Sequence, residues 1–458
     1  MRVAQPGLRH LQVKYTRGLA GIFLHVLGLC LLGYAYLGKG FAYIGIPPFY
    51  VDSVLIFISG LYLLLHPGSF LSKKDPLLIS LLLFMGWGAI RTLPYISIYG
   101  IDALRDSVIW SYGIVALVLG YLTWKTPLEL LVTRWYLSRM GWLPFWAPFA
   151  FLLYGLYRET LPRFPWGPLG GIPIVYPKGG DVGVHLAGIL SYRLFVWPYC
   201  CAGGLQRRLF WLAWLVSFGF VAFTGRGAFL AVAFVAFILA FHASLAQRIR
   251  VVALVIFFVL TMWLFGLEID IGMPRKVSVD QFVKNVASIF TYVEDFKGEG
   301  TKQWRLMWWN EIINYTFWGP YFWTGKGFGI NLADDDGFQV APDRSLRSPH
   351  NAHMTVLARA GVPGFALWML FLALLMSRLW LSYWRWRFRG ERSQAGLRLW
   401  TFSYLLAAII NATFDVFLEG PMGGIWFWSI VGFGIGLLLK ERGFTRGEGF
   451  KKTSQRGD

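Results

Sequence analysis

The residues best suited to chemistry lie in one polar stretch between positions 343 and 364, DRSLRSPHNAHMTVLARAGVPG. His350 lies in it, with Arg344, Arg347 and Arg359 nearby along the chain. A titratable imidazole beside fixed positive charges suits proton transfer next to an anionic substrate. The arginine charges favour the uncharged imidazole, which can accept a proton. The pattern therefore makes His350 a candidate general base.

These polar residues also have structural interpretations that need no catalytic role or metal. A histidine at the start of a helix is often only a cap or a core partner. His353 lies three residues after His350 and would share its helical face, but no third ligand of matching spacing accompanies the pair. Asp334–Asp336 is typical of a solvated acidic turn rather than a metal site. We therefore expect neither a metal nor a cofactor.

Arg226 is a second candidate, because it lies between Gly225 and Gly227 in the segment FTGRGAFLA. Glycines let the backbone turn tightly and let a substrate approach it closely. If a helix begins here, its free amide groups and dipole also favour an anion. Arg226 is then a candidate phosphate ligand. The alternative is an arginine that reaches to the membrane interface.

A third feature is the aromatic segment 301–317, TKQWRLMWWNEIINYTF, which predicts a helix. Its larger apolar residues share one side, so the helix can lie along the membrane interface and hold Arg305 at a defined depth. These residues are Trp304, Met307, Trp308, Ile312 and Tyr315.

The elements that must position these groups are apolar. Of 458 residues, 56% are hydrophobic and 15% are charged, and the apolar runs recur near the ~20 residues that cross a bilayer as a helix. This pattern predicts an all-α polytopic membrane protein with about twelve transmembrane helices. The expected spans are 18–37, 48–65, 76–94, 103–124, 142–157, 182–200, 208–223, 227–243, 251–267, 353–377, 399–415 and 421–439.

The net charge of +19 is not spread evenly. The excess of Lys and Arg falls in the two tails and in alternate loops, as in the basic run RWRFRGER (385–392). The positive-inside rule then places both termini in the cytoplasm, where the basic runs meet anionic lipid headgroups. Membrane lipids, and not nucleic acid, are the partners that this distribution predicts.

Four segments follow from this topology: a bundle of about nine spans (1–267), an extracytoplasmic loop with interfacial helices (268–352), C-terminal transmembrane helices (353–440) and a basic cytoplasmic tail (441–458). Arg193 falls near mid-membrane in the sixth span, and we interpret it as structural.

Ionisable residues at membrane depth are costly and often functional, yet they can also hold helices together. Those expected at the outer helix ends are Arg91, Asp102, Arg105, Asp106, Asp415 and Glu419.

The chain resembles the O-antigen ligase and O-antigen polymerase family of bacterial envelope polysaccharide glycosyltransferases. The resemblance lies in TGRGAFL, in the helix with Trp304, Arg305 and Trp309, in GKGFGIN (325–331) and in SPHNAHMTVLARAGVPGF, in that order. Its most specific part is the pattern His350, Asn351, Leu357, Gly361 and Gly364. The family implies a GT-C-like membrane fold with one large extracytoplasmic loop.

The resemblance also implies an activity. Family members transfer a glycan from undecaprenyl pyrophosphate to a sugar hydroxyl at the outer face of the inner membrane, without nucleotide sugar, and the ligases among them work without metal. A single displacement inverts the anomeric centre. His350 is then the general base, Arg226 and Arg305 bind pyrophosphate by family position, and Arg347 is added by proximity. Possible supporting residues are Asn351, Arg91, Arg105 and Asp415.

Several alternatives stay open at this point. The acceptor is lipid A-core in a ligase, another lipid-linked glycan in a polymerase, and a protein in an oligosaccharyltransferase. A polytopic solute transporter and a scaffold protein are interpretations from other classes, although the chain shows no convincing internal repeat.

Overall fold

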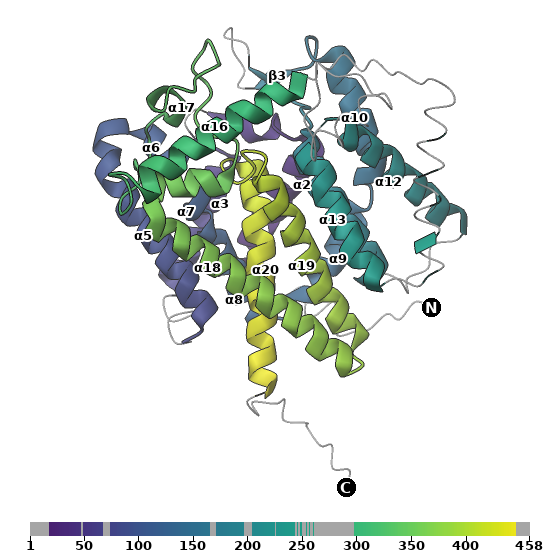
Figure 1. Ribbon diagram of the computed structural model, residues 1–458. Helices are drawn as coiled ribbons and strands as arrows, with labels where there is room; N and C mark the ends of the chain where they lie inside the picture. The colour runs from purple at the N-terminus through teal and green to yellow at the C-terminus, as the bar shows by residue number, and fades with distance from the viewer. Residues whose placement is uncertain are drawn as a thin grey trace.

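A computed structural model describes residues 18–46, 49–66, 74–164, 171–196, 204–224, 226–242 and 297–445, with isolated residues between 245 and 260. This part of the chain is mostly helical. Most helices run between an upper and a lower end in the view of Figure 1, while α16 (Lys297–Phe317) lies across the upper end. α20 (Pro421–Thr445) runs through the middle of the bundle towards the C-terminus below.

The N-terminal half contains α2 (Gly18–Leu37), α3 (Val51–Leu65), α5 (Pro76–Tyr99), α6 (Ile101–Asp106), α7 (Val108–Ser111), α8 (Gly113–Lys125), α9 (Leu128–Met140) and α10 (Leu143–Tyr157). Next come α11 (Gly179–Ser191), the short π-helix η2 (Tyr192–Val196), α12 (Gly204–Thr224) and α13 (Arg226–His242). A 3-10 turn, η1 (Phe41–Tyr43), and two small antiparallel pairs complete it: β1 (Gly45–Ile46) with β2 (Phe49–Tyr50), and β3 (Arg163–Phe164) with β4 (Ile172–Pro173).

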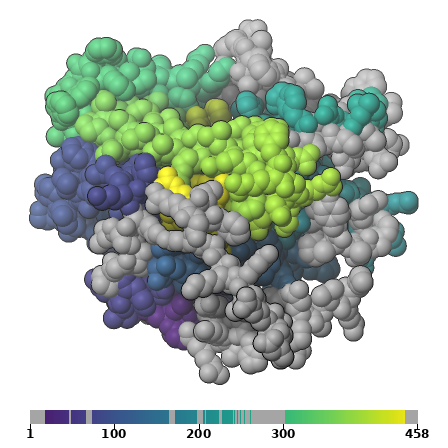
Figure 2. Space-filling model, turned by 90° about the horizontal axis from the view of Figure 1, so that it is seen from below, coloured from purple at the N-terminus to yellow at the C-terminus, as the bar shows by residue number. Residues whose placement is uncertain are grey.

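The C-terminal half contains α16, the single turn α17 (Leu332–Asp335), α18 (Ala352–Phe388), α19 (Arg392–Ala412) and α20. α18 packs against both α19 and α5. Figure 2 shows the lower end of the molecule, where the lime-green atoms of α18 and α19 form a broad ridge beside the blue atoms of the N-terminal helices. This packing brings α18 against α5, which precedes it by more than two hundred residues.

Six described helices are long and apolar enough to cross a membrane: Gly18–Leu37, Pro76–Tyr99, Val108–Lys125, Ala352–Phe388, Arg392–Ala412 and Pro421–Arg442. Four more apolar helices are shorter: Val51–Leu65, Leu143–Tyr157, Arg208–Ala222 and Gly227–Leu239. The prediction of a multi-pass helical membrane protein is confirmed. The number twelve stays a prediction, because the expected span 251–267 falls largely outside the described residues.

Several expected boundaries were wrong. The span expected at 103–124 starts as two short helices, α6 and α7, before α8 begins. The span expected at 182–200 is the thirteen-residue α11, which passes into the π-helix η2 at Tyr192. The basic loop expected at 378–398 is mostly helical, because α18 extends to Phe388 and α19 begins at Arg392. Long amphipathic side chains can continue a helix beyond the apolar region into the headgroup layer.

The segment expected to be a helix at 301–317 is helical as part of α16. Trp308 and Ile312 are fully buried on one side of α16, as expected for its apolar face. Met307 is 58% exposed and does not belong to that face, contrary to the prediction. Consecutive residues of a helix point in directions about 100° apart, so Met307 points away from the buried side when Trp308 points into it.

The buried carboxylate of Asp106 joins three segments that are far apart in the sequence: α6, the chain from 325 to 350, and α18. Asp106, at the end of α6, accepts hydrogen bonds from Arg347 Nη2 at 3.0 Å and from the Gly329 amide at 3.1 Å. Arg359 Nη2 lies 2.9 Å from the same carboxylate oxygen. Arg359 is 1% exposed and also donates to the carbonyl oxygens of Gly327 and Ile330. The glycine turn at 325–331, the irregular segment before His350 and α18 are therefore fixed to one another.

This cluster generates a stability prediction. Arg359→Met removes one partner and leaves the Asp106 carboxylate buried with less compensation, which costs about 3–5 kcal/mol in comparable buried pairs. For a chain of this length that is a fall of roughly 5 °C in melting temperature, measured by differential scanning fluorimetry in detergent. The matched control is Arg105→Gln, whose side chain is 51% exposed beside Asp102 and Asp106 and should change stability by less than about 1 kcal/mol. Equal melting temperatures for both variants would contradict the account.

Candidate active site

His350 lies immediately before α18 in a backbone conformation that is unusual for its type. Its φ is +54°, in the left-handed region that non-glycine residues rarely adopt, and such strain is found mainly at functional sites. Two contacts on either side hold it there. Trp309 Nε1 donates to the carbonyl oxygen of Pro349 at 2.9 Å, and Asn351 caps α18 by accepting from the amides of His353 and Met354.

The carboxylate that faces His350 comes from the turn between α19 and α20. His350 Nδ1 lies 3.9 Å from Asp415 Oδ1, which is an electrostatic contact rather than a hydrogen bond at this distance. Burial alone would raise the pKa of Asp415, but the His350 imidazole, the Lys178 ammonium and the Val416 amide outweigh it and lower the pKa to about 2. Asp415 is therefore a fixed negative charge that stabilises a protonated His350.

Arg305 reaches the same turn from α16. Its Nη1 donates to the carbonyl oxygen of Phe414 at 2.8 Å, one residue before Asp415. The neighbouring Trp304 ring lies edge-on to the His350 ring, with centroids 6.4 Å apart. α16 thus brings a guanidinium and an indole to the position where the imidazole and the carboxylate meet.

The first residues of two further helices meet this turn. α13 begins at Arg226, whose side chain lies outside the described residues. A Cβ at Gly227 would lie 2.8 Å from the Phe414 Cβ and 3.4 Å from Asn411 Oδ1, so only glycine allows α13 to start this close. The amide groups at a helix N-terminus favour an anion. The position of the α13 backbone therefore agrees with the role that the sequence predicts for Arg226.

α11 begins on another side of the turn and supplies groups that the sequence analysis did not assign to the site. Gly180 contacts both Asn411 and Asp415 so closely that a Cβ there would lie within 3.2 Å of their side chains. Burial lowers the pKa of Lys178, but the charges of Asp415 and Asp181 outweigh this effect and raise the pKa above its ordinary value. Lys178 is therefore a charged ammonium beside the site.

Only weak sequence signals marked these additional residues. Lys178 falls in a Pro/Gly-rich loop, where a solvated lysine is the usual interpretation. Asn411 was expected inside an apolar span at 399–415, but α19 ends at Ala412 and places the amide at the helix end. An uncompensated amide in a span was the one signal that could have identified it.

Four buried polar atoms around this turn have no hydrogen-bond partner among the residues that the structure describes. Buried polar groups in folded proteins are nearly always paired, so an unpaired group calls for an explanation. A polar ligand bound between α11, α16 and the turn 413–420 would supply the missing partners. The four atoms are Asp181 Oδ2, Trp304 Nε1, His350 Nδ1 and Asn411 Nδ2.

The arginines nearest to His350 in the sequence have other partners. Arg347 binds Asp106, lies 3.5 Å from Asp102 and donates to the Gly329 carbonyl oxygen at 2.7 Å, so its guanidinium is occupied in a structural cluster. Arg359 belongs to the same cluster. Arg344 is exposed and lies 3.9 Å from Asp334. The charges that surround His350 therefore come from remote parts of the chain.

The other expected supporting residues also hold structure together. Arg91 Nε donates to the carbonyl oxygen of Thr324 at 2.7 Å, which ties α5 to the chain before the glycine turn. Arg105 pairs with Asp102 at 3.1 Å on the surface of α6. Asn351 is buried as the cap of α18. These geometries favour positioning over contact with a substrate.

The remaining polar candidates have structural partners as well. His353 Nδ1 accepts a hydrogen bond from Trp368 Nε1 at 3.0 Å in the core, and does not share a site with His350. Lys326 binds Asp335 at 2.5 Å and also Asp336, which in turn accepts from Trp308 Nε1 at 2.6 Å. The acidic turn at 334–336 is therefore largely an ion-pair cluster rather than a solvated one.

The comparison with protein families agrees with the order of these elements. The O-antigen ligase family model matches residues 211–369, from within α12 to the first half of α18. This region belongs to the O-antigen ligase family. It includes Arg226, Arg305 and His350, whereas Lys178 and Asp415 lie outside the matched residues of the O-antigen ligase region. No curated protein sequence matches the chain.

The charge state of Asp415 generates a pH prediction. Its pKa in the folded state lies below its ordinary value, so the stability that it contributes is fully present above about pH 4 and is lost as the pH falls towards 2. We expect Asp415→Asn to unfold more easily than the unaltered chain at pH 6, by on the order of 2 kcal/mol, and the gap to narrow at pH 3. Thermal unfolding in detergent at both pH values measures this. A gap that is the same at pH 6 and pH 3 would contradict the predicted charge of Asp415.

Proposed function

We propose that the protein is an inverting glycosyltransferase that transfers a glycan from undecaprenyl pyrophosphate to a sugar hydroxyl at the outer face of the inner membrane. The O-antigen ligase region and the apolar helices support a membrane glycosyltransferase in general. The observation that supports the finer proposal is the convergence of His350, Asp415 and Arg305 on the turn 413–420. An acceptor hydroxyl and an anionic leaving group both find suitable partners there.

In the proposed reaction, His350 removes the proton from the acceptor hydroxyl. Nδ1 faces the carboxylate of Asp415, which leaves Nε2 to accept the proton. As the imidazole becomes positively charged, the fixed negative charge of Asp415 stabilises it. The oxygen of the acceptor forms a bond to the anomeric carbon while the bond from that carbon to the pyrophosphate oxygen breaks. The pyrophosphate keeps the electron pair, and the anomeric centre inverts.

Stabilisation of the leaving pyrophosphate requires positive charge. Arg305 is held at the turn by its bond to the Phe414 carbonyl, and an arginine that is fixed before reaction stabilises developing charge without reorganisation. Arg226 is proposed for the same role from its position at the start of α13. Lys178 supplies a third positive charge near Asp415. Arg347 is not part of this proposal, because Asp102 and Asp106 occupy it.

Substitutions of the proposed base and of the proposed pyrophosphate ligand test this reaction. We expect His350→Ala to lower transfer by about 10²–10⁴-fold, the range for loss of a general base. Arg305→Ala should lower it by at least roughly 10²-fold, as for loss of one group that stabilises developing charge. The assay uses purified protein, lipid-pyrophosphate glycan and acceptor. The control is Arg158→Ala, an exposed arginine paired with Glu159, which should keep normal turnover. Near-normal turnover of His350→Ala and Arg305→Ala would contradict the roles proposed for these two residues.

Ligase and polymerase activities differ only in the acceptor, and a gene deletion separates them. Loss of attachment to lipid A-core with free polymer retained indicates a ligase. Surface glycans with single repeats indicate a polymerase. A solute transporter is the alternative from another class, and it predicts uptake into liposomes without release of glycan from the lipid carrier.

A further inference from the structure

A cavity lies at the end of α11 that is farther from His350. α11 begins beside Asp415 and passes into η2 at Tyr192, so Arg193 is roughly 20 Å further along the helix axis at 1.5 Å per residue. The cavity has a volume of ≈ 450 Å³ and lies between α9, α10, α11 and α12. That volume is within the range of roughly 300–1,000 Å³ found for small-molecule sites. The proposed transfer reaction does not use it.

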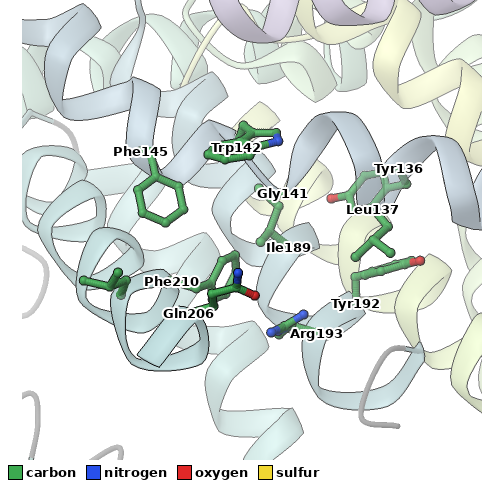
Figure 3. A pocket seen from close by; sticks show the side chains of 11 residues that line it. Tyr136, Leu137, Gly141, Trp142, Phe145, Ile189, Tyr192, Arg193, Gln206 and Phe210 are labelled. Carbon is green, nitrogen blue, oxygen red and sulfur yellow. The ribbon is translucent and has the colours of Figure 1, made fainter. Parts of the chain in front are cut away.

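The walls of this cavity are apolar and aromatic, with a cation at one end. Figure 3 shows Trp142 and Phe145 on one side and Tyr136 and Leu137 on another, with Arg193 below them. The Arg193 guanidinium carbon lies 5.0 Å from the centre of the Phe210 ring. An apolar groove that ends at a guanidinium matches an amphipathic molecule with an anionic head.

The cavity opens at an apolar part of the molecular surface. Three of its lining residues are large, apolar and exposed: Trp142 at 66%, Leu209 at 47% and Phe145 at 43%. Exposed apolar groups on membrane helices meet lipid, and tryptophan is enriched at the level of the headgroups. A ligand of this groove therefore arrives from the membrane rather than from water.

The local backbone also sets Arg193 apart. It lies in the five-residue π-helix η2, and single π turns inside helices are frequent at functional sites. The wider turn changes the direction of the side chains that follow α11. Tyr192, beside it, is fixed by a hydrogen bond from its hydroxyl to the Thr133 carbonyl oxygen at 2.7 Å. The charged end of the groove is therefore held in place by α9.

We propose that this groove binds an anionic phospholipid, with the lipid phosphate at Arg193 and an acyl chain along the aromatic wall between α10 and α12. The charge distribution of the chain predicts that this end of the bundle faces the cytoplasm, where anionic lipids attract basic residues. The apolar wall matches the chain and the guanidinium matches the phosphate. Arg193 was expected near mid-membrane, as a structural residue. It lies instead after the last residue of α11, in η2, and the cavity adds a ligand.

The test compares lipids that differ in headgroup charge. The purified full-length protein in detergent is titrated with phosphatidylglycerol or with phosphatidylcholine of the same chains, and retained lipid is counted by native mass spectrometry. We expect phosphatidylglycerol to bind at least about tenfold more tightly, as for one charge-assisted contact. Arg193→Gln should remove most of that preference. Arg134→Gln, an exposed arginine on α9 outside the lining, should keep it.

A second variant tests the groove without a change in charge. Leu209→Trp fills the opening with a larger side chain at an exposed position and should lower the retention of phosphatidylglycerol by about the same factor. Size-exclusion chromatography shows whether Arg193→Gln folds. If it does not, Leu209→Trp still tests whether the lipid binds in this groove. Equal retention of the two lipids by the unaltered protein overturns the proposal. So does a preference that survives Leu209→Trp, because the lipid then binds elsewhere.

Discussion

The buried carboxylate of Asp106 is the constraint on which the arrangement of α6, the glycine turn at 325–331 and α18 depends. It holds Arg359 of α18 and Arg347 of the preceding segment, and it accepts the Gly329 amide. The Arg347 and Arg359 guanidinium groups and the Gly329 amide compensate most of the desolvation of this carboxylate, and Arg105, which is half-exposed, lies 3.6 Å away. The loss of Arg347 or Arg359 therefore leaves the buried charge with less compensation. The result is that α18 starts at a fixed place, and His350 is held in its strained conformation just before it.

The rest of the site is built by helix ends that meet near His350. The N-termini of α11 and α13 and one face of α16 all meet the turn between α19 and α20, where Asp415 lies. Glycine at 180 and at 227 makes this approach possible, since a Cβ at either position would collide with Asn411, Phe414 or Asp415. Helix N-termini and cations lie together where the proposed reaction needs an anion site, and the carboxylate lies beside the imidazole that becomes positive in that reaction.

Some of this could be predicted from the sequence and some could not. Local spacing identified His350, the helix that carries Arg305 and the glycine-flanked start of α13, because each depends on neighbours within a few residues. Asp415 was expected only as one of four supporting residues. Its pairing with His350 could not be derived from local spacing, since Asp415 lies 65 positions later and reaches His350 only through the packing of α18, α19 and α20. For the same reason Arg347, although three residues from His350, was given a ligand role where the structure shows a partner in α6.

The most direct measurement is a structure of the protein with an undecaprenyl-pyrophosphate glycan bound, determined by electron cryomicroscopy in lipid nanodiscs. Our account predicts the pyrophosphate beside Arg305 and the start of α13, with the anomeric carbon facing His350 Nε2 across from Asp415. A pyrophosphate bound away from the turn 413–420, with His350 out of reach of the anomeric carbon, would contradict it.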